Sequence, residues 1–137
     1  MTLIEHMTLL TKKKELLNKI LSNTESQIRL IRQQKMVGIK RLLRARRQLL
    51  DELAELIQWE AAGLCWDDLA EVQALRRQIW QAEQQLVAAS SLAVQLALNE
   101  KKRIAEQMRG NSQAREIHQT YIGRWYQGVS RGFSRKV

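Results

Sequence analysis

The sequence has no proline, one cysteine and few aromatic residues: its 137 residues include four Trp, two Tyr and one Phe. Without proline, the residue that most strongly interrupts a helix, long helices can run unbroken. Cys65 alone cannot form an internal disulfide, which fits a reducing compartment. No apolar run approaches the roughly 20 residues of a membrane span, and the first residues lack the basic-then-apolar order of a secretory signal. We therefore expect a cytoplasmic protein.

Six glycines divide the chain into three long segments and a tail; they stand at 38, 63, 110, 123, 128 and 132. Leu, Gln, Arg, Glu, Ala and Lys dominate, and all favour helices. We predict an all-α fold: an elongated antiparallel three-helix bundle, or coiled-coil hairpin, with helices near 2–34, 39–58 and 67–109. Residues 1–109 form this bundle, and residues 110–137 form a basic, aromatic-containing tail, partly helical to about 122 and otherwise flexible or docked on a partner.

Apolar residues recur about every 3.5 positions in the first segment, as in a coiled coil, although Lys14 and Thr24 interrupt the series. The series is Leu3, Met7, Leu10, Leu17, Leu21, Ile28 and Ile31. Beyond Gly38 the apolar face is displaced by one residue, about 100° around the axis. A kink or a short turn is expected near Lys35–Gly38.

The third segment repeats the three-and-four spacing of apolar residues, with alanines that allow a close helix neighbour. Its series is Val72, Leu75, Ile79, Ala82, Leu86, Ala89, Ala93 and Leu96. The chain reverses between Trp59 and Asp68, where Gly63 is expected to end a helix in the left-handed conformation. Asp67 or Asp68 is expected to cap the next helix.

Charge is unevenly distributed along the chain, whose net charge is +9. Residues 29–50 carry eight Lys or Arg and no carboxylate, whereas residues 51–100 have a net charge of −7 and residues 101–137 of +7. A basic strip beside an acidic one favours an antiparallel helix arrangement. The basic residues also form a candidate patch for phosphates, made of Arg29, Arg32, Lys40, Arg41, Arg44 and Arg47.

No constellation typical of an enzyme is present, and we expect neither catalysis nor a bound metal, cofactor or small-molecule substrate. His6 and His118 lie in different segments without a His, Cys or carboxylate at metal-ligand spacing, and His6 is interpreted as an exposed residue. Cys65 has no nearby histidine, and no glycine-rich phosphate loop follows a strand. The basic run lacks the interleaved aromatics of single-strand binders, which argues against nucleic acid.

A leucine motif in the second segment resembles one found in a known family. Leu42-Leu43-x-x-Arg46-x-x-Leu49-Leu50-x-x-Leu53 is similar to the leucine-pair motif of the FlgN-type flagellar export chaperones. As in that family, it follows a first helix of about 30 residues and a glycine-containing break. A long third helix with Ala97-Leu98-Asn99 and a basic tail ending Phe133-Ser134-Arg135-Lys136 are similar too. The sequence departs from the family where Lys35, Lys40 and Arg41 stand at commonly acidic positions.

The resemblance implies a chaperone, without ATPase activity, that binds the C-terminal helical segments of hook–filament junction proteins before type III export. Such a chaperone would hold the amphipathic helix of its cargo in an apolar groove. The expected contact residues are Leu96, Ile104, Met108, Tyr121, Trp125, Tyr126 and Phe133. Two other classes stay open. One is a stalk-like coiled-coil component that contacts the export ATPase, and the other is a basic helical protein that binds nucleic acid. A homodimer through uncovered apolar seams is also open.

Overall fold

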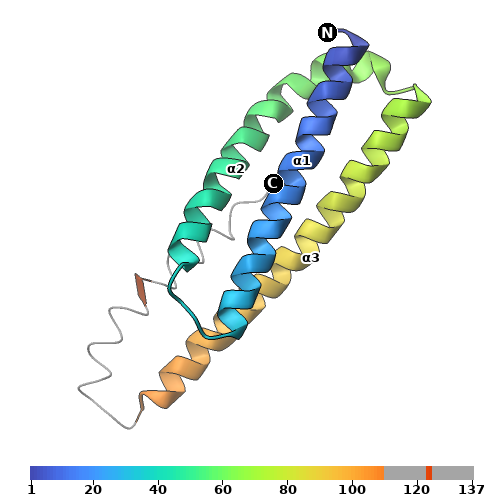
Figure 1. The fold of residues 1–137 in the computed structure, drawn as a ribbon. Helices are drawn as coiled ribbons and strands as arrows, with labels where there is room; N and C mark the ends of the chain where they lie inside the picture. Colours follow the sequence, from blue (N-terminus) through green and yellow to red (C-terminus); the bar gives the residue numbers. More distant parts are fainter. Residues whose placement is uncertain (110–122, 125–137) are drawn as a thin grey trace.

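The computed structural model describes residues 1–109 and 123–124, and the elements in these ranges are all helical. The elements are α1 (Leu3–Arg32), α2 (Ile39–Glu60), the 3₁₀ helix η1 (Ala61–Trp66) and α3 (Ala70–Gln107) (Figure 1). The predicted all-α class is confirmed, and the three predicted helices match these bounds to within a few residues. The predicted helical turns to about residue 122 fall outside the described residues.

Helix α1 lies between α2 and α3 (Figure 1). The chain runs down α1, back up α2 and down α3, so α2 is antiparallel to both of the other helices. The closest backbone packing is between α1 and α3 and between α1 and α2. The last turns of α3 continue past the connection between α1 and α2 (Figure 1).

Both ends of α1 are set by local chemistry. The Thr2 hydroxyl accepts a hydrogen bond from the Glu5 backbone N–H at 3.2 Å, and the Glu5 carboxylate accepts one from the Thr2 backbone N–H at 3.1 Å. This reciprocal capping box fixes the start of the helix. After Arg32 the chain takes positive φ angles at Gln34 (58°) and Gly38 (100°), which an α-helix cannot accommodate. The predicted break near 35–38 is therefore a turn between separate helices.

The buried side chains form two hydrophobic clusters with polar residues between them. The larger cluster is made by Leu9, Leu10, Leu16, Leu17, Ile20, Leu50, Leu53, Val72, Ile79, Ala82 and Leu86. The smaller cluster, near the α1–α2 turn, is made by Ile31, Ile39, Leu43 and Ala97. Four of the buried polar residues lie between the two clusters in sequence: Asn23, Thr24 and Gln27 on α1 and Arg46 on α2.

Arg46 of α2 is the centre of that polar layer and is only 2% exposed. Its guanidinium donates hydrogen bonds to the Thr24 hydroxyl on α1 and, at 3.2 Å, to the Ser90 hydroxyl on α3. Beside it, the Asn23 amide donates to the Leu42 carbonyl at 2.9 Å and accepts from Gln27 at 2.7 Å. Burial lowers the pKa of Arg46 because it removes water from the cation. Arg46 thus belongs to the interior, although in sequence it lies within the basic run of residues 29–50.

The second reversal differs from the prediction in three respects. Gly63 lies in η1, and Gly38 is the one glycine with positive φ among the described residues, so Gly63 is not a left-handed stop. It is buried against His6, where only a hydrogen atom fits. Neither aspartate caps α3, because its N-cap residue is Leu69 and makes no side-chain cap. Asp67 instead faces His6, which is fully buried rather than exposed as predicted.

Candidate partner-binding surfaces

An exposed apolar stripe follows one side of α3. Trp80 and Val87 are 60% and 62% exposed, Leu98 is 41% exposed, and Val94 between them is half-buried. The spacings of seven, seven and four residues place these four side chains on one helix face. Over about 27 Å, this face has the pattern of a coiled-coil seam while lying in solvent. We call it the α3 stripe.

Three predicted contact residues, two on α3 and the third its C-cap residue Met108, lie on another side of the helix from the stripe, toward the core. Leu96 is half-buried and packs against the smaller hydrophobic cluster. Ile104 and Met108 are also half-buried, and their positions seven and eleven residues after Ala97 continue the core-facing series. The other four predicted contact residues, Tyr121, Trp125, Tyr126 and Phe133, lie outside the described residues.

The six residues of the predicted basic patch are all exposed and flank the α1–α2 turn. Beside them is an open cavity of about 560 Å³ between the end of α1 and the start of α2. Its lining combines the basic side chains of Arg29 and Arg41 with the apolar side chains of Leu30 and Leu42. This region, which we call the basic pocket, offers both cationic and apolar contacts to a partner.

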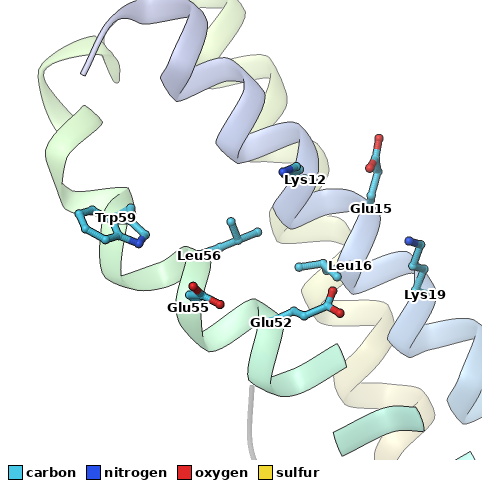
Figure 2. Close-up of a pocket in the computed structure, with 8 residues that line it drawn as sticks. All are labelled: Lys12, Glu15, Leu16, Lys19, Glu52, Glu55, Leu56 and Trp59. Carbon is cyan, nitrogen blue, oxygen red and sulfur yellow. The ribbon is translucent and has the colours of Figure 1, made fainter. Parts of the chain in front are cut away.

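A second cavity, of about 400 Å³, lies between the same two helices nearer the η1 end. Figure 2 shows Leu16 of α1 and Leu56 of α2 pointing toward each other across it, with Trp59 next to Leu56. Its edges are charged: they carry Lys12, Glu15 and Lys19 on α1 and Glu52 and Glu55 on α2. We call this region the Trp59 pocket, and Trp59 itself is 60% exposed.

A chain of ion pairs joins the helices at the η1 end. Lys13 Nζ lies 3.1 Å from a Glu60 carboxylate oxygen and 3.7 Å from Glu83, while Arg76 donates to Glu60 and, at 3.2 Å, to Asp67. Burial by itself lowers the pKa of Arg76, but its hydrogen bonds to Glu60 and Asp67 and their negative charges raise it by more. The resulting network holds the end of α2 and the chain before α3 against α1, which is a structural role.

Neither a metal site nor a membrane span is found in the part of the chain that the structure describes. In residues 1–109 and 123–124, no group of three His, Cys, Asp or Glu side chains is arranged to hold a metal ion. None of the helices in these ranges combines the length and apolar character that a membrane crossing requires. Comparisons with family models, curated proteins and solved structures found no match to this chain.

Three features were not predicted from the sequence: the α3 stripe, the capping box of α1 and the contact between His6 and Asp67. Trp80 and Val87 are the most exposed members of the α3 stripe, and their seven-residue spacing was visible in the sequence. The Thr2-x-x-Glu5 capping box was visible as well. By contrast, the pairing of His6 with Asp67, 61 residues apart, carries no local signal.

Proposed function

We propose that this protein is an export chaperone, an elongated three-helix bundle that binds amphipathic helical segments of another protein and has no catalytic activity. The observation that carries the proposal is the α3 stripe, with Trp80 and Val87 more than half exposed. Isolated exposed apolar residues are common on proteins, but a series at heptad spacing is what a partner helix packs against. Binding would bury these side chains and shield the partner helix from self-association.

The resemblance of the Arg46 motif to the FlgN-type chaperones supplies the identity of the cargo within this proposal. The cargo would be the C-terminal helical segments of hook–filament junction proteins, held unassembled in the cytoplasm before flagellar type III export. Ile104, in the last turns of α3, and Met108, its C-cap residue, lie on another side from the stripe and would add a separate contact with the cargo. Their positions are compatible with a partner helix that continues beyond the packed part of α3.

A peptide-binding experiment with charge substitutions tests this proposal. The probe is a labelled peptide with the C-terminal helix of a hook–filament junction protein, followed by fluorescence anisotropy. Trp80→Asp and Val87→Asp should each weaken binding by about tenfold or more, because a central aromatic or aliphatic anchor carries much of the affinity. Gln85→Asp, an exposed position on a different side of α3, is the matched control and should bind like the wild type.

Two results would count against the proposal. If the stripe variants retain full affinity with unchanged helix content, the peptide binds elsewhere. If no junction-protein helix binds at all, the cargo assignment is wrong.

The exposure of all six basic-patch residues favours a second candidate function, nucleic-acid binding. Micromolar binding to RNA or DNA at physiological salt, falling steeply as salt rises, would support that alternative.

A further inference from the structure

The outward side of α2 divides into a basic half and an acidic half. The exposed residues on this side recur at spacings of three and four, so they share one face. They are Arg41, Arg44, Gln48, Glu52, Glu55 and Trp59. Two arginines thus occupy the first half, two glutamates occupy the second half, and an exposed tryptophan ends the series. Over about 27 Å, α2 presents opposite charges at its two ends.

The two cavities between α1 and α2 lie at the two ends of this charged face. The basic pocket, with Arg41 in its lining, is at the start of α2, and the Trp59 pocket is at its end. Each has an apolar floor: Leu30 and Leu42 in the first, and Leu16 and Leu56 in the second (Figure 2). The face therefore offers two partly apolar depressions with charges arranged along the helix between them.

We propose that this α1–α2 face binds a second copy of the same chain, with the two α2 helices antiparallel across a twofold axis near Leu50. In that register Arg44 of one copy lies opposite Glu55 of the other, and Gln48 lies opposite Glu52. Arg41 lies opposite Trp59, so the indole of each copy enters the basic pocket of the other, against Leu42 and under the guanidinium. The same contacts form at both ends of the face, as a twofold interface requires.

The charges favour this occupant and this orientation over others. A parallel pairing would place arginines against arginines and glutamates against glutamates, which is unfavourable. A nucleic acid would be attracted by the basic half but repelled by Glu52 and Glu55. The antiparallel copy matches each half with its opposite, and it packs four helices, two from each chain, around the apolar side chains of the two pockets. The proposal concerns a face of α1 and α2, so it goes beyond the partner contacts proposed for α3.

Charge exchange between chains is the decisive test. Arg41→Glu/Arg44→Glu and Glu52→Arg/Glu55→Arg are each expected to convert the dimer to a monomer, because both ends of the interface then carry like charges. Mixing these two variants should restore a dimer, since the face of one chain then carries only acidic charges and the face of the other only basic ones. A single chain with all four substitutions should also dimerise if the helices are antiparallel. In a parallel pair, that chain would keep like charges together and remain a monomer.

Sedimentation velocity at micromolar concentrations, at low and high salt, gives the masses for wild type and variants, and circular dichroism checks that helix content is unchanged. The wild-type dimer should weaken as salt rises.

Crosslinking in a Cys65→Ser background tests the relative orientation of the two α2 helices. Gln48→Cys, near the axis, should form a disulfide between chains, and Trp59→Cys, far from it, should not. A wild-type monomer at low salt, a dimer insensitive to the charge reversals, or a crosslink through Trp59→Cys alone would overturn the proposal. Trp80→Asp should leave the dimer intact, which keeps this result separate from cargo binding.

Discussion

Gly63 packs so closely against His6 that a Cβ atom added at residue 63 would lie 1.8 Å from the His6 Nδ1 atom. The histidine is fully buried, and its Nε2 atom lies 3.2 Å from Asp67 Oδ1. This close contact joins η1, which follows α2, to the start of α1. The requirement for glycine here is one of space, because its φ angle is not positive.

The Gly63→Ala substitution is expected to destabilise the fold by about 1–3 kcal/mol, the usual cost of overpacking a closed interior. Urea unfolding followed by circular dichroism gives this difference. In the His6→Ala background the same substitution should cost much less, because the imidazole that it would strike is gone. A double-mutant cycle that shows simple additivity would contradict the direct contact.

Gly38→Ala should destabilise the protein through its backbone conformation and not through a steric clash. Gly38 has a φ of 100°, but an added Cβ would meet only Leu30 Cδ1, at an ordinary 3.6 Å. The cost is therefore conformational, about 1–2 kcal/mol for an L-residue held in left-handed geometry. Gly38→Asn, which tolerates positive φ better, should cost less than Gly38→Ala in the same urea experiment. Equal costs for the two variants would indicate a steric origin instead.

The buried Arg46 predicts a contrast between two substitutions. Arg46→Ala removes the hydrogen bonds to Thr24 and Ser90 and leaves a cavity between the two hydrophobic clusters, so a loss of about 3–5 kcal/mol is expected. Arg46→Met keeps most of the volume and joins the clusters with apolar atoms, so it should cost far less or stabilise the protein. Thermal and urea unfolding distinguish the two variants. A Met variant as unstable as the Ala variant would show that the hydrogen bonds, rather than the filled volume, matter most.

The Arg76 ion pairs predict a modest, salt-dependent contribution. Arg76 is partly exposed, so Arg76→Met should lower the free energy of unfolding by about 1 kcal/mol or less, and the difference should shrink in high salt. Because its pKa is raised, the contribution of this cation is present at neutral pH and is lost only when the pH rises through that raised pKa. Wild type and variant should therefore keep a constant difference from neutral pH to about pH 10. A difference that falls within this range would mean that another group controls the network.

The helix number, the approximate helix bounds and the break at Gly38 could be predicted because each depends on local sequence. Proline is absent, the apolar spacing averages about 3.5 residues, and one glycine stands where the apolar face is displaced. The interpretation of Gly63 was wrong because a glycine before a new helix usually ends the previous one, and only its close approach to His6 required otherwise.

Arg46 shows the same limit within the second helix. In sequence it is one of three arginines between the leucine pairs at 42/43 and 49/50. Unlike Arg44 and Arg47, it stands three residues after Leu43 and four before Leu50, on the apolar face. Its side chain is buried because α1 and α3 bring two hydroxyls, from Thr24 and Ser90, to the one position of the helix that faces them. The spacing on α2 thus indicates the core face for Arg46, but the hydrogen-bond partners that allow a cation to be buried there come from other helices and leave no signal on α2.

By itself, the sequence determined an all-helical chain with a turn at Gly38, since helix propensity and apolar periodicity act within a few residues. Only the tertiary structure decided which polar groups became interior and which apolar groups stayed in solvent. Burial depends on which side chains the neighbouring helices place opposite each residue. His6 and Arg46 are buried against polar partners, whereas Trp59 and Trp80 lie on faces that none of the other described helices covers.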